Sequence, residues 1–282
     1  MKNLNINKVS LVDLSFNDCL RNLRTLEKSI DASKLKPLKI AVLRSYTIET
    51  IEPLLRLGLL QENYSPQFFF GDYNNYTQEI LDSSSAFYKF EPHVTLVMIR
   101  IEELLPDFID NFGIRPYKEW EEIINKTVIS IIKLVDTISA RTATQTIIQI
   151  ISYPENPYWG IYEGQLPEGQ VSLINKFNHL LSEELIKRKS SFIWDYNSFI
   201  NKYGYNNIHD PKMWHVSKNP FKQSAYPFIA NDILKYILSV LGKIKKCIVL
   251  DLDNTLWGGI AGEDGFNGIK LGHDYPGRCY QD

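Results

Sequence analysis

Short apolar runs alternate with longer amphipathic stretches between residues 38 and 241. The runs are rich in β-branched and aromatic residues and end at Gly, Pro or polar residues, so each predicts a buried strand. The predicted strands are 38–43, 67–70, 94–99, 146–151 and 191–194. Between and around them, apolar residues at helical spacing predict helices over 20–26, 48–59, 75–81, 117–140, 171–187 and 230–241. Pro53 falls inside the second of these, so that helix either starts late or is kinked.

This alternation predicts an α/β fold with three layers, in which helices cover both faces of a largely parallel sheet. We expect a helical lead-in over residues 1–36, the α/β domain over 37–242, and the start of another domain over 243–282. The stretch from Gly204 to Pro220 is polar and irregular, and we expect a long surface loop there.

Composition excludes several classes of protein. The net charge is −2, the isoelectric point is about 6.2 and no long basic run occurs, so we expect no nucleic-acid partner and no anionic membrane partner. Cys19, Cys247 and Cys279 form no CxxC pair, which excludes a disulfide framework and a structural zinc site. With no apolar leader and no membrane-spanning run, a cytoplasmic location is expected.

The segment with the clearest chemistry begins at Lys246 and has the sequence KCIVLDLDNTLWGG. An apolar strand would deliver Asp251 and Asp253 to its carboxyl end, on the same side of the chain. One carboxylate can attack phosphorus and form an aspartyl-phosphate, and the second can protonate the leaving group and then activate water. Asn254, Thr255 and nearby backbone groups would donate to the phosphoryl oxygens. A turn in which Asp253 merely caps the next element is the structural alternative.

This DxDxT arrangement resembles the first motif of the haloacid-dehalogenase (HAD) superfamily. The resemblance implies that Asp251 is the nucleophile and a magnesium ligand. It also implies that Asp253 is the general acid/base and that its backbone carbonyl is a further ligand, so that Mg²⁺ is the expected cofactor. Only 31 residues follow Asp251, and we expect them to be too few for the parallel sheet and the remaining phosphate and metal ligands of such a domain. We therefore expect this chain alone to lack the full catalytic set.

The residues around this motif narrow the resemblance to the FkbH-like HAD proteins (subfamily IIIC). The similar segments are 252–259, 262–265, 268–272 and 276–277 near the end, and 43–49, 71–76, 82–85, 210–214 and 219–220 earlier in the chain. Members of this family resemble glyceryl transferases of polyketide-type pathways. The resemblance therefore implies a phosphorylated three-carbon acid as substrate, typically 1,3-bisphosphoglycerate, and an acyl carrier protein as partner.

The leading domain resembles the SGNH hydrolases, whose fold is flavodoxin-like. In that class a nucleophilic Ser follows the first strand, as Ser45 does here, and a DxxH pair lies late in the domain. Asp210 and His215 are the corresponding residues, although their spacing is two residues too long, and His209 is a second candidate. The oxyanion-hole residues of that class have no clear match; Gly71 with Asn74, or Asn156, would replace them. A turn or cap role is the structural alternative for Ser45.

These observations leave three functions open. The first is the N-terminal part of a magnesium-dependent HAD phosphatase or glyceryl transferase. The second is a docking module without chemistry, in which aromatic residues line a groove for a carrier-protein arm; a core role is the alternative for those aromatics. The third is an SGNH-type esterase or acyltransferase that acts through Ser45. Contact between Ser45 and His215 would favour the third function over the second.

Overall fold

The computed structural model describes residues 8–281, which form two compact units that divide between Leu241 and Gly242. We call residues 8–241 the leading unit and residues 242–281 the second unit.

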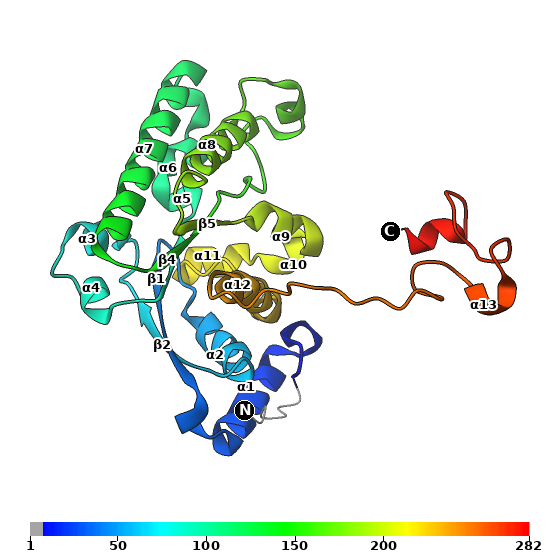
Figure 1. Ribbon diagram of the computed structural model, residues 1–282. Coiled ribbons are helices and arrows are strands. Elements are labelled where there is room, and N and C mark those ends of the chain that lie inside the picture. Colours follow the sequence, from blue (N-terminus) through cyan, green and yellow to red (C-terminus); the bar gives the residue numbers. More distant parts are fainter. Residues whose placement is uncertain (1–7, 282) are drawn as a thin grey trace. The chain divides into compact units, whose positions relative to one another are not determined.

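A five-stranded sheet forms the centre of the leading unit (Figure 1). Its strands are β1 (Lys36–Arg44), β2 (Tyr64–Phe70), β3 (Val94–Met98), β4 (Gln145–Gln149) and β5 (Ser191–Trp194). They pair in the order β2-β1-β3-β4-β5, and all the pairs are parallel. The predicted fold class, a three-layer α/β fold with a largely parallel sheet, is confirmed. β2 lies on one side of β1, whereas β3, β4 and β5 lie on the other, so the order in which strands are added reverses between β1 and β3. A crevice forms at the carboxyl ends of the strands at such a switch point.

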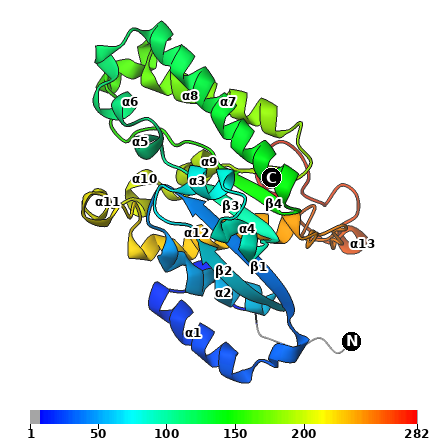
Figure 2. The same cartoon turned by 90° about the vertical axis from the view of Figure 1, so that its left-hand side faces the viewer.

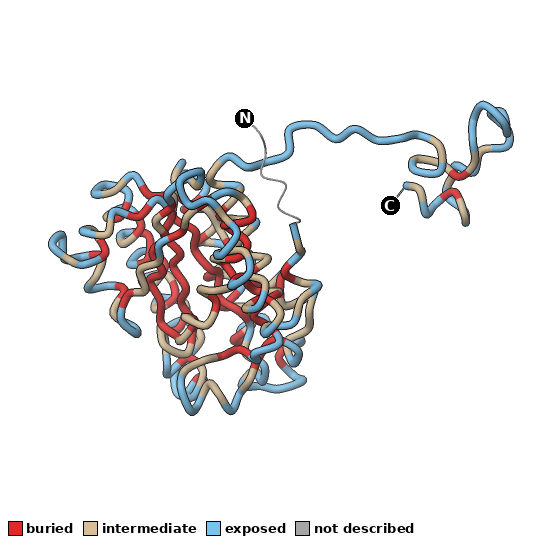
Figure 3. Tube along the Cα trace, turned by 90° about the horizontal axis from the view of Figure 1, so that it is seen from below, coloured by how far each residue is buried: buried red, intermediate tan, exposed pale blue. Residues whose placement is uncertain are grey.

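Helices cover both faces of the sheet (Figure 2). One face packs against α1 (Phe16–Ser29), α2 (Glu52–Gln61) and α12 (Tyr226–Val240), and the other against α3 (Tyr76–Leu81), α4 (Ala86–Phe90), α7 (Tyr117–Arg141) and α8 (Gln170–Leu185). Each face has its own hydrophobic core, since residues that alternate along a strand point to opposite sides. Ile40 and Val42 of β1 lie in one core, whereas Ala41 and Leu43 lie in the other. Figure 3 shows the buried residues gathered in the middle of the leading unit, with exposed residues around its outside.

The helix that was expected to be affected by Pro53 starts late. A 3-10 turn over Glu49–Ile51 precedes α2, and Pro53 lies in the first turn of α2. Proline is accepted there because the first N–H groups of a helix have no partner within the helix.

The prediction of a long surface loop over 204–220 is wrong. This region contains α10 (Tyr205–Ile208) and α11 (Pro211–Ser217), and it follows α9 (Tyr196–Tyr203). Ile208 and Phe221 are 1% and 2% exposed, and His209 pairs with Phe221 in an antiparallel bridge. These few buried residues anchor a polar segment, and they are too widely spaced to give a periodic signal. The short helices α5 (Ile101–Leu104) and α6 (Pro106–Asp110) were also not predicted.

The second unit contains a short α-helix, α13 (Ala261–Asp264), and a 3-10 helix over Gly277–Tyr280. It also has two isolated bridges, Asp253 with Trp257 and Gly258 with Lys270. The strand predicted over 246–250 is not formed among the described residues. Ile248 and Val249 are 78% and 91% exposed. A strand is defined by hydrogen bonds to a neighbouring strand, and no described segment pairs with this one. None of the described helices is long and apolar enough to cross a membrane.

Candidate functional site at the carboxyl edge of the sheet

Ser45 and Arg100 follow the ends of β1 and β3, where the switch-point crevice is expected. The Ser45 N–H donates to the Met98 carbonyl at 3.0 Å, and the Arg100 N–H donates to Ser45 Oγ at 2.9 Å. Ser45 is fully buried. Its hydroxyl therefore serves as an acceptor that joins the ends of two adjacent strands.

Arg100 is the central charged residue of this edge and is only 6% exposed. Its guanidinium forms an ion pair with Glu102, and its central carbon lies 4.9 Å from the centre of the Trp214 ring. Nη1 is buried and has no hydrogen-bond partner among the described residues. Lys218 also lies over Trp214, at 4.6 Å, and forms a 2.9 Å ion pair with Glu103. Both cations are thus neutralised by adjacent carboxylates.

His209 is held as a neutral buried side chain. Its Nε2 lies 2.8 Å from the Tyr196 hydroxyl, its Nδ1 lies 3.2 Å from the Tyr205 carbonyl, and its ring stacks on that of Tyr205. Burial, followed by the positive charge of Arg100, lowers the pKa of His209 to about 3. A histidine in this state contributes shape and hydrogen bonding, and it is a weak base at neutral pH.

The described structure does not bring Ser45, Asp210 and His215 together as a triad. Asp210 Oδ1 accepts from the Met213 N–H at 3.0 Å and caps α11. His215 is exposed on α11, and the hydroxyl of Ser45 contacts the Arg100 backbone instead of an imidazole. The candidate oxyanion donors Gly71 and Asn74 are engaged elsewhere, because their N–H groups donate to the carbonyls of Val42 and Arg44, and the alternative, Asn156, lies exposed. A nucleophile needs an accessible oxygen and an adjacent base, and Ser45 has neither.

Two adjoining cavities along this edge are lined by residues of α9, α10 and α11, among others. The ribbon of Figure 1 shows these three helices near one another. The larger cavity, of about 670 Å³, is lined by Arg100, Trp214 and Lys218 among others. The second, of about 450 Å³, shares with it Glu155, Asn156 and Tyr205. Together they form one groove, which we call the edge groove.

The Asp251–Asp253 motif of the second unit has a defined local structure. Asp251 is exposed, and its Oδ1 accepts from the Leu252 N–H at 2.8 Å. Asp253 Oδ1 accepts from both Trp257 Nε1 and the Ala261 N–H at 3.0 Å. These two bonds orient the Asp253 carboxylate and close the turn that follows it.

Asn254 and Thr255, the predicted phosphoryl-binding residues, lie in that turn. Asn254 has a φ of 53°, in the left-handed region, and its Oδ1 accepts from the Gly259 N–H at 2.9 Å. Asparagine is among the few non-glycine residues that adopt this conformation readily. Thr255 is exposed, and its N–H donates to the Leu252 carbonyl at 3.3 Å.

The described residues do not complete a magnesium site. No group of three or more His, Cys, Asp or Glu side chains that could hold a metal occurs among residues 8–281. Mg²⁺ requires six oxygen ligands in near-octahedral geometry, of which proteins usually supply at least one or two carboxylates. Asp251 and Asp253 are of the right chemical type, but as found here they are an incomplete set, and no step through a metal follows from them.

Comparison with known proteins identifies the family of this chain and a solved structure with the same fold. Residues 39–238 match the family model described as FkbH, N-terminal domain. A similar solved structure is the N-terminal part of the protein BF1531 from Bacteroides fragilis, which is described as containing a phosphatase domain and complexed with Mg. Its sequence is 24% identical to that of this chain, and the two structures match with a TM-score of 0.77 over 95% of this chain and 68% of that one. This likeness shows a shared fold.

Weaker structural matches are esterases and a lipase. The lipase Lip_vut3 from a goat rumen metagenome is 10% identical with a TM-score of 0.49, over 70% of this chain and 95% of that one. A catalytic mutant of the acetylxylan esterase Axe2 from Geobacillus stearothermophilus is 10% identical with a TM-score of 0.47, over 72% and 96%. Similarity at this level carries no argument about function. No curated protein matches the sequence.

Proposed function

The chain belongs to the FkbH family, whose N-terminal domain it carries over residues 39–238, and from that premise we propose that it is the N-terminal part of a magnesium-dependent HAD-type phosphatase. The observation that carries the proposal is the Asp251–Asp253 pair, held at the start of a turn that exposes the first carboxylate and orients the second. The shared fold with a protein whose crystal structure contains a phosphatase domain and Mg supports it.

In the proposed reaction, a carboxylate oxygen of Asp251 attacks the phosphorus atom of a phosphate ester or acyl phosphate. The new bond joins that oxygen to phosphorus while the bond from phosphorus to the leaving oxygen breaks. Asp253 gives its proton to the leaving oxygen, then takes a proton from the water that hydrolyses the aspartyl-phosphate. Both hydrogen bonds to Asp253 fall on Oδ1, so Oδ2 is the oxygen that we assign to proton transfer. Mg²⁺, with Asp251 and Asp253 as ligands from this chain, would neutralise the clustered negative charge.

A finer proposal concerns the substrate. We propose a phosphorylated three-carbon acid as donor and the phosphopantetheine thiol of an acyl carrier protein as glyceryl acceptor, on the family resemblance of the segments around the motif. On this proposal the protein serves a polyketide-type pathway in the cytoplasm.

The leading unit would then be a binding scaffold with no hydrolytic chemistry of its own. The environment of Ser45 favours a scaffold role over an esterase activity, because the Ser45 hydroxyl is buried and accepts a backbone hydrogen bond. A groove nevertheless remains open at the edge of the sheet where α/β proteins bind ligands.

The test is a phosphatase assay on the full-length protein with Mg²⁺, using p-nitrophenyl phosphate and 3-phosphoglycerate. Asp251→Asn is expected to abolish turnover, because an amide oxygen is a far poorer nucleophile than a carboxylate. Asp274→Asn is the matched control, since it makes the same change in the same unit outside the motif, and its activity should equal that of the wild type. Retention of activity by Asp251→Asn would rule out the proposed nucleophile.

A further inference from the structure

The edge groove has features of a ligand site that neither the phosphatase motif nor a hydrolase triad uses. It combines two adjoining cavities of about 670 and 450 Å³ that share Glu155, Asn156 and Tyr205. Volumes in this range match those of small-molecule sites. It also lies at the carboxyl ends of the strands, where the fold places ligands.

The charge of the groove excludes a strongly anionic ligand. Its lining contains two cations, Arg100 and Lys218, against five carboxylates. Both cations are already paired, Arg100 with Glu102 and Lys218 with Glu103. His209 is neutral, because its pKa is lowered to about 3. A phosphate or carboxylate ligand would meet net negative charge with no free cation in the lining to offset it.

The remaining lining is suited to hydroxyl groups. Four asparagine amides line the smaller cavity, and each amide both donates and accepts hydrogen bonds, as a hydroxyl does. Glu155 and Asn156 are exposed, and neither side chain has a hydrogen-bond partner among the described residues, so both are available to a ligand. The exposed ring of Tyr153, and the ring of Tyr205, which stacks on His209, add aromatic surface against which apolar C–H groups pack.

The unsatisfied donor of Arg100 also favours a ligand that carries hydroxyl groups. Nη1 is buried without an acceptor, and a buried group of this kind ordinarily has a partner, which is often a water or a ligand. A neutral hydroxyl, or a water held by it, would supply that acceptor without adding negative charge beside Glu102.

From this lining we propose that the edge groove binds a neutral carbohydrate, a chain of sugar units without acidic groups. Carboxylates accept from its hydroxyls, amides bond in both directions and aromatic rings pack on its C–H faces. The site lies wholly in the leading unit and does not involve Asp251, so its test is independent of the phosphatase proposal.

The experiment is isothermal titration of the full chain with four trisaccharides: cellotriose, xylotriose, maltotriose and trigalacturonic acid. At least one neutral trisaccharide is expected to bind saturably, with a dissociation constant at least tenfold lower than that of trigalacturonic acid. Asn156→Ala should weaken that binding roughly three- to tenfold, the effect of losing one hydrogen bond. Asn125→Ala, on α7, is the matched control, because Asn125 lines neither cavity, and it should leave the binding unchanged.

A second variant tests the role of charge. Glu155→Gln keeps the shape of an exposed side chain and removes one negative charge, so it should narrow the preference for the neutral over the acidic trisaccharide. The proposal is overturned if no neutral trisaccharide binds saturably, if the acidic one binds equally well or better, or if Asn156→Ala binds as the wild type does.

Discussion

Ser45 Oγ accepts the backbone N–H of Arg100 at 2.9 Å, and this bond joins the ends of β1 and β3 across the switch point of the sheet. The side chain that the sequence suggested as a nucleophile is here used for structure. Because both groups are buried, removal of the acceptor leaves an unsatisfied donor.

Ser45→Ala is therefore expected to lower the free energy of unfolding by about 1–3 kcal/mol. It should leave hydrolysis of p-nitrophenyl acetate at the level of the wild type. Urea unfolding followed by tryptophan fluorescence measures the first effect. Ser217→Ala is the control, because the Ser217 hydroxyl is exposed and donates only to a carbonyl in its own helix. Loss of a saturable esterase activity in Ser45→Ala would show that the hydroxyl has a catalytic role after all.

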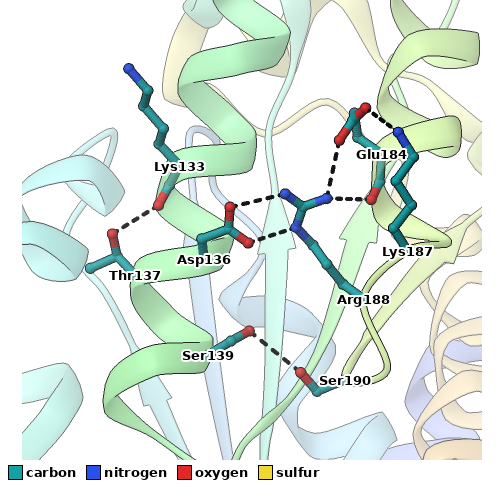
Figure 4. Close-up of polar contacts among 8 residues, drawn as sticks. All are labelled: Lys133, Asp136, Thr137, Ser139, Glu184, Lys187, Arg188 and Ser190. Carbon is teal, nitrogen blue, oxygen red and sulfur yellow. Dashed lines mark hydrogen bonds and ion pairs between the residues drawn. The ribbon is translucent and has the colours of Figure 1, made fainter.

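Arg188 links α7 to α8 (Figure 4). Its Nε and Nη2 donate to the two carboxylate oxygens of Asp136 at 2.6 and 2.9 Å, and its Nη1 donates to Glu184. The Arg188 side chain is only 21% exposed, so this two-point contact is worth more than an ordinary surface ion pair.

We expect Arg188→Met to lower the free energy of unfolding by about 1–2 kcal/mol, since methionine keeps the apolar stem and removes the paired bonds. Arg21→Met is a suitable control, because Arg21 is 77% exposed and pairs with Asp18 within one helix. The interpretation fails if the two variants lose the same amount of stability in urea.

His209 gives the stability of the leading unit a dependence on pH. The pKa of His209 is lowered from 6.5 to about 3 in the folded protein, so between these values the unfolded chain binds a proton that the folded chain does not. Stability therefore decreases as pH falls from 6.5 towards 3, by at most about 1.4 kcal/mol per pH unit from this group.

His209→Gln should remove this contribution, so that its stability declines less steeply than that of the wild type over the same range. Urea unfolding at a series of pH values gives the slopes. His179→Gln is the control, because the His179 side chain is 71% exposed on α8. A His209 imidazole that NMR shows to titrate near 6.5 would contradict the account.

Much of the fold could be predicted because the buried strands are continuous apolar runs. In a parallel sheet covered on both faces, every residue of β3 is buried and β1 is buried from Ile40 to Arg44, and β-branched residues mark both strands clearly. Long helices such as α7 were equally clear, since one face of α7 carries Trp120, Ile124, Val128 and Val135 at helical spacing.

The edge groove could not be predicted as one site, because its residues come from separate elements. The sequence singled out Asp210, His215 and Asn156 for a hydrolase site, but no local pattern shows that they line a common groove with Arg100 and Lys218. Arg100 lies just after an apolar strand and is buried only because Glu102 neutralises it and Trp214 covers it. A run of sequence cannot show such a partner 114 residues away. His209 was singled out as a candidate, but its burial against Tyr196 and Tyr205 follows from tertiary packing.

The predicted strand over 246–250 failed for a related reason. Its apolar pattern is suited to a buried strand, yet Leu250 is 53% exposed, since a strand exists only when a neighbour supplies hydrogen bonds. The Asp251–Asp253 motif itself needs no such neighbour to be recognised, because its residues are adjacent in sequence.

The covalent intermediate is the most direct test of the central proposal. Full-length protein with Mg²⁺ is incubated with a phosphoryl donor, quenched in acid, digested and analysed by mass spectrometry for the peptide that contains Asp251. The account predicts a peptide that is heavier by one phosphoryl group and modified at Asp251. This peptide should be absent from Asp251→Asn. It should accumulate in Asp253→Asn if that substitution slows hydrolysis of the aspartyl-phosphate more than it slows the attack of Asp251. Phosphorylation at another residue, or turnover without any aspartyl-phosphate at Asp251, would contradict it.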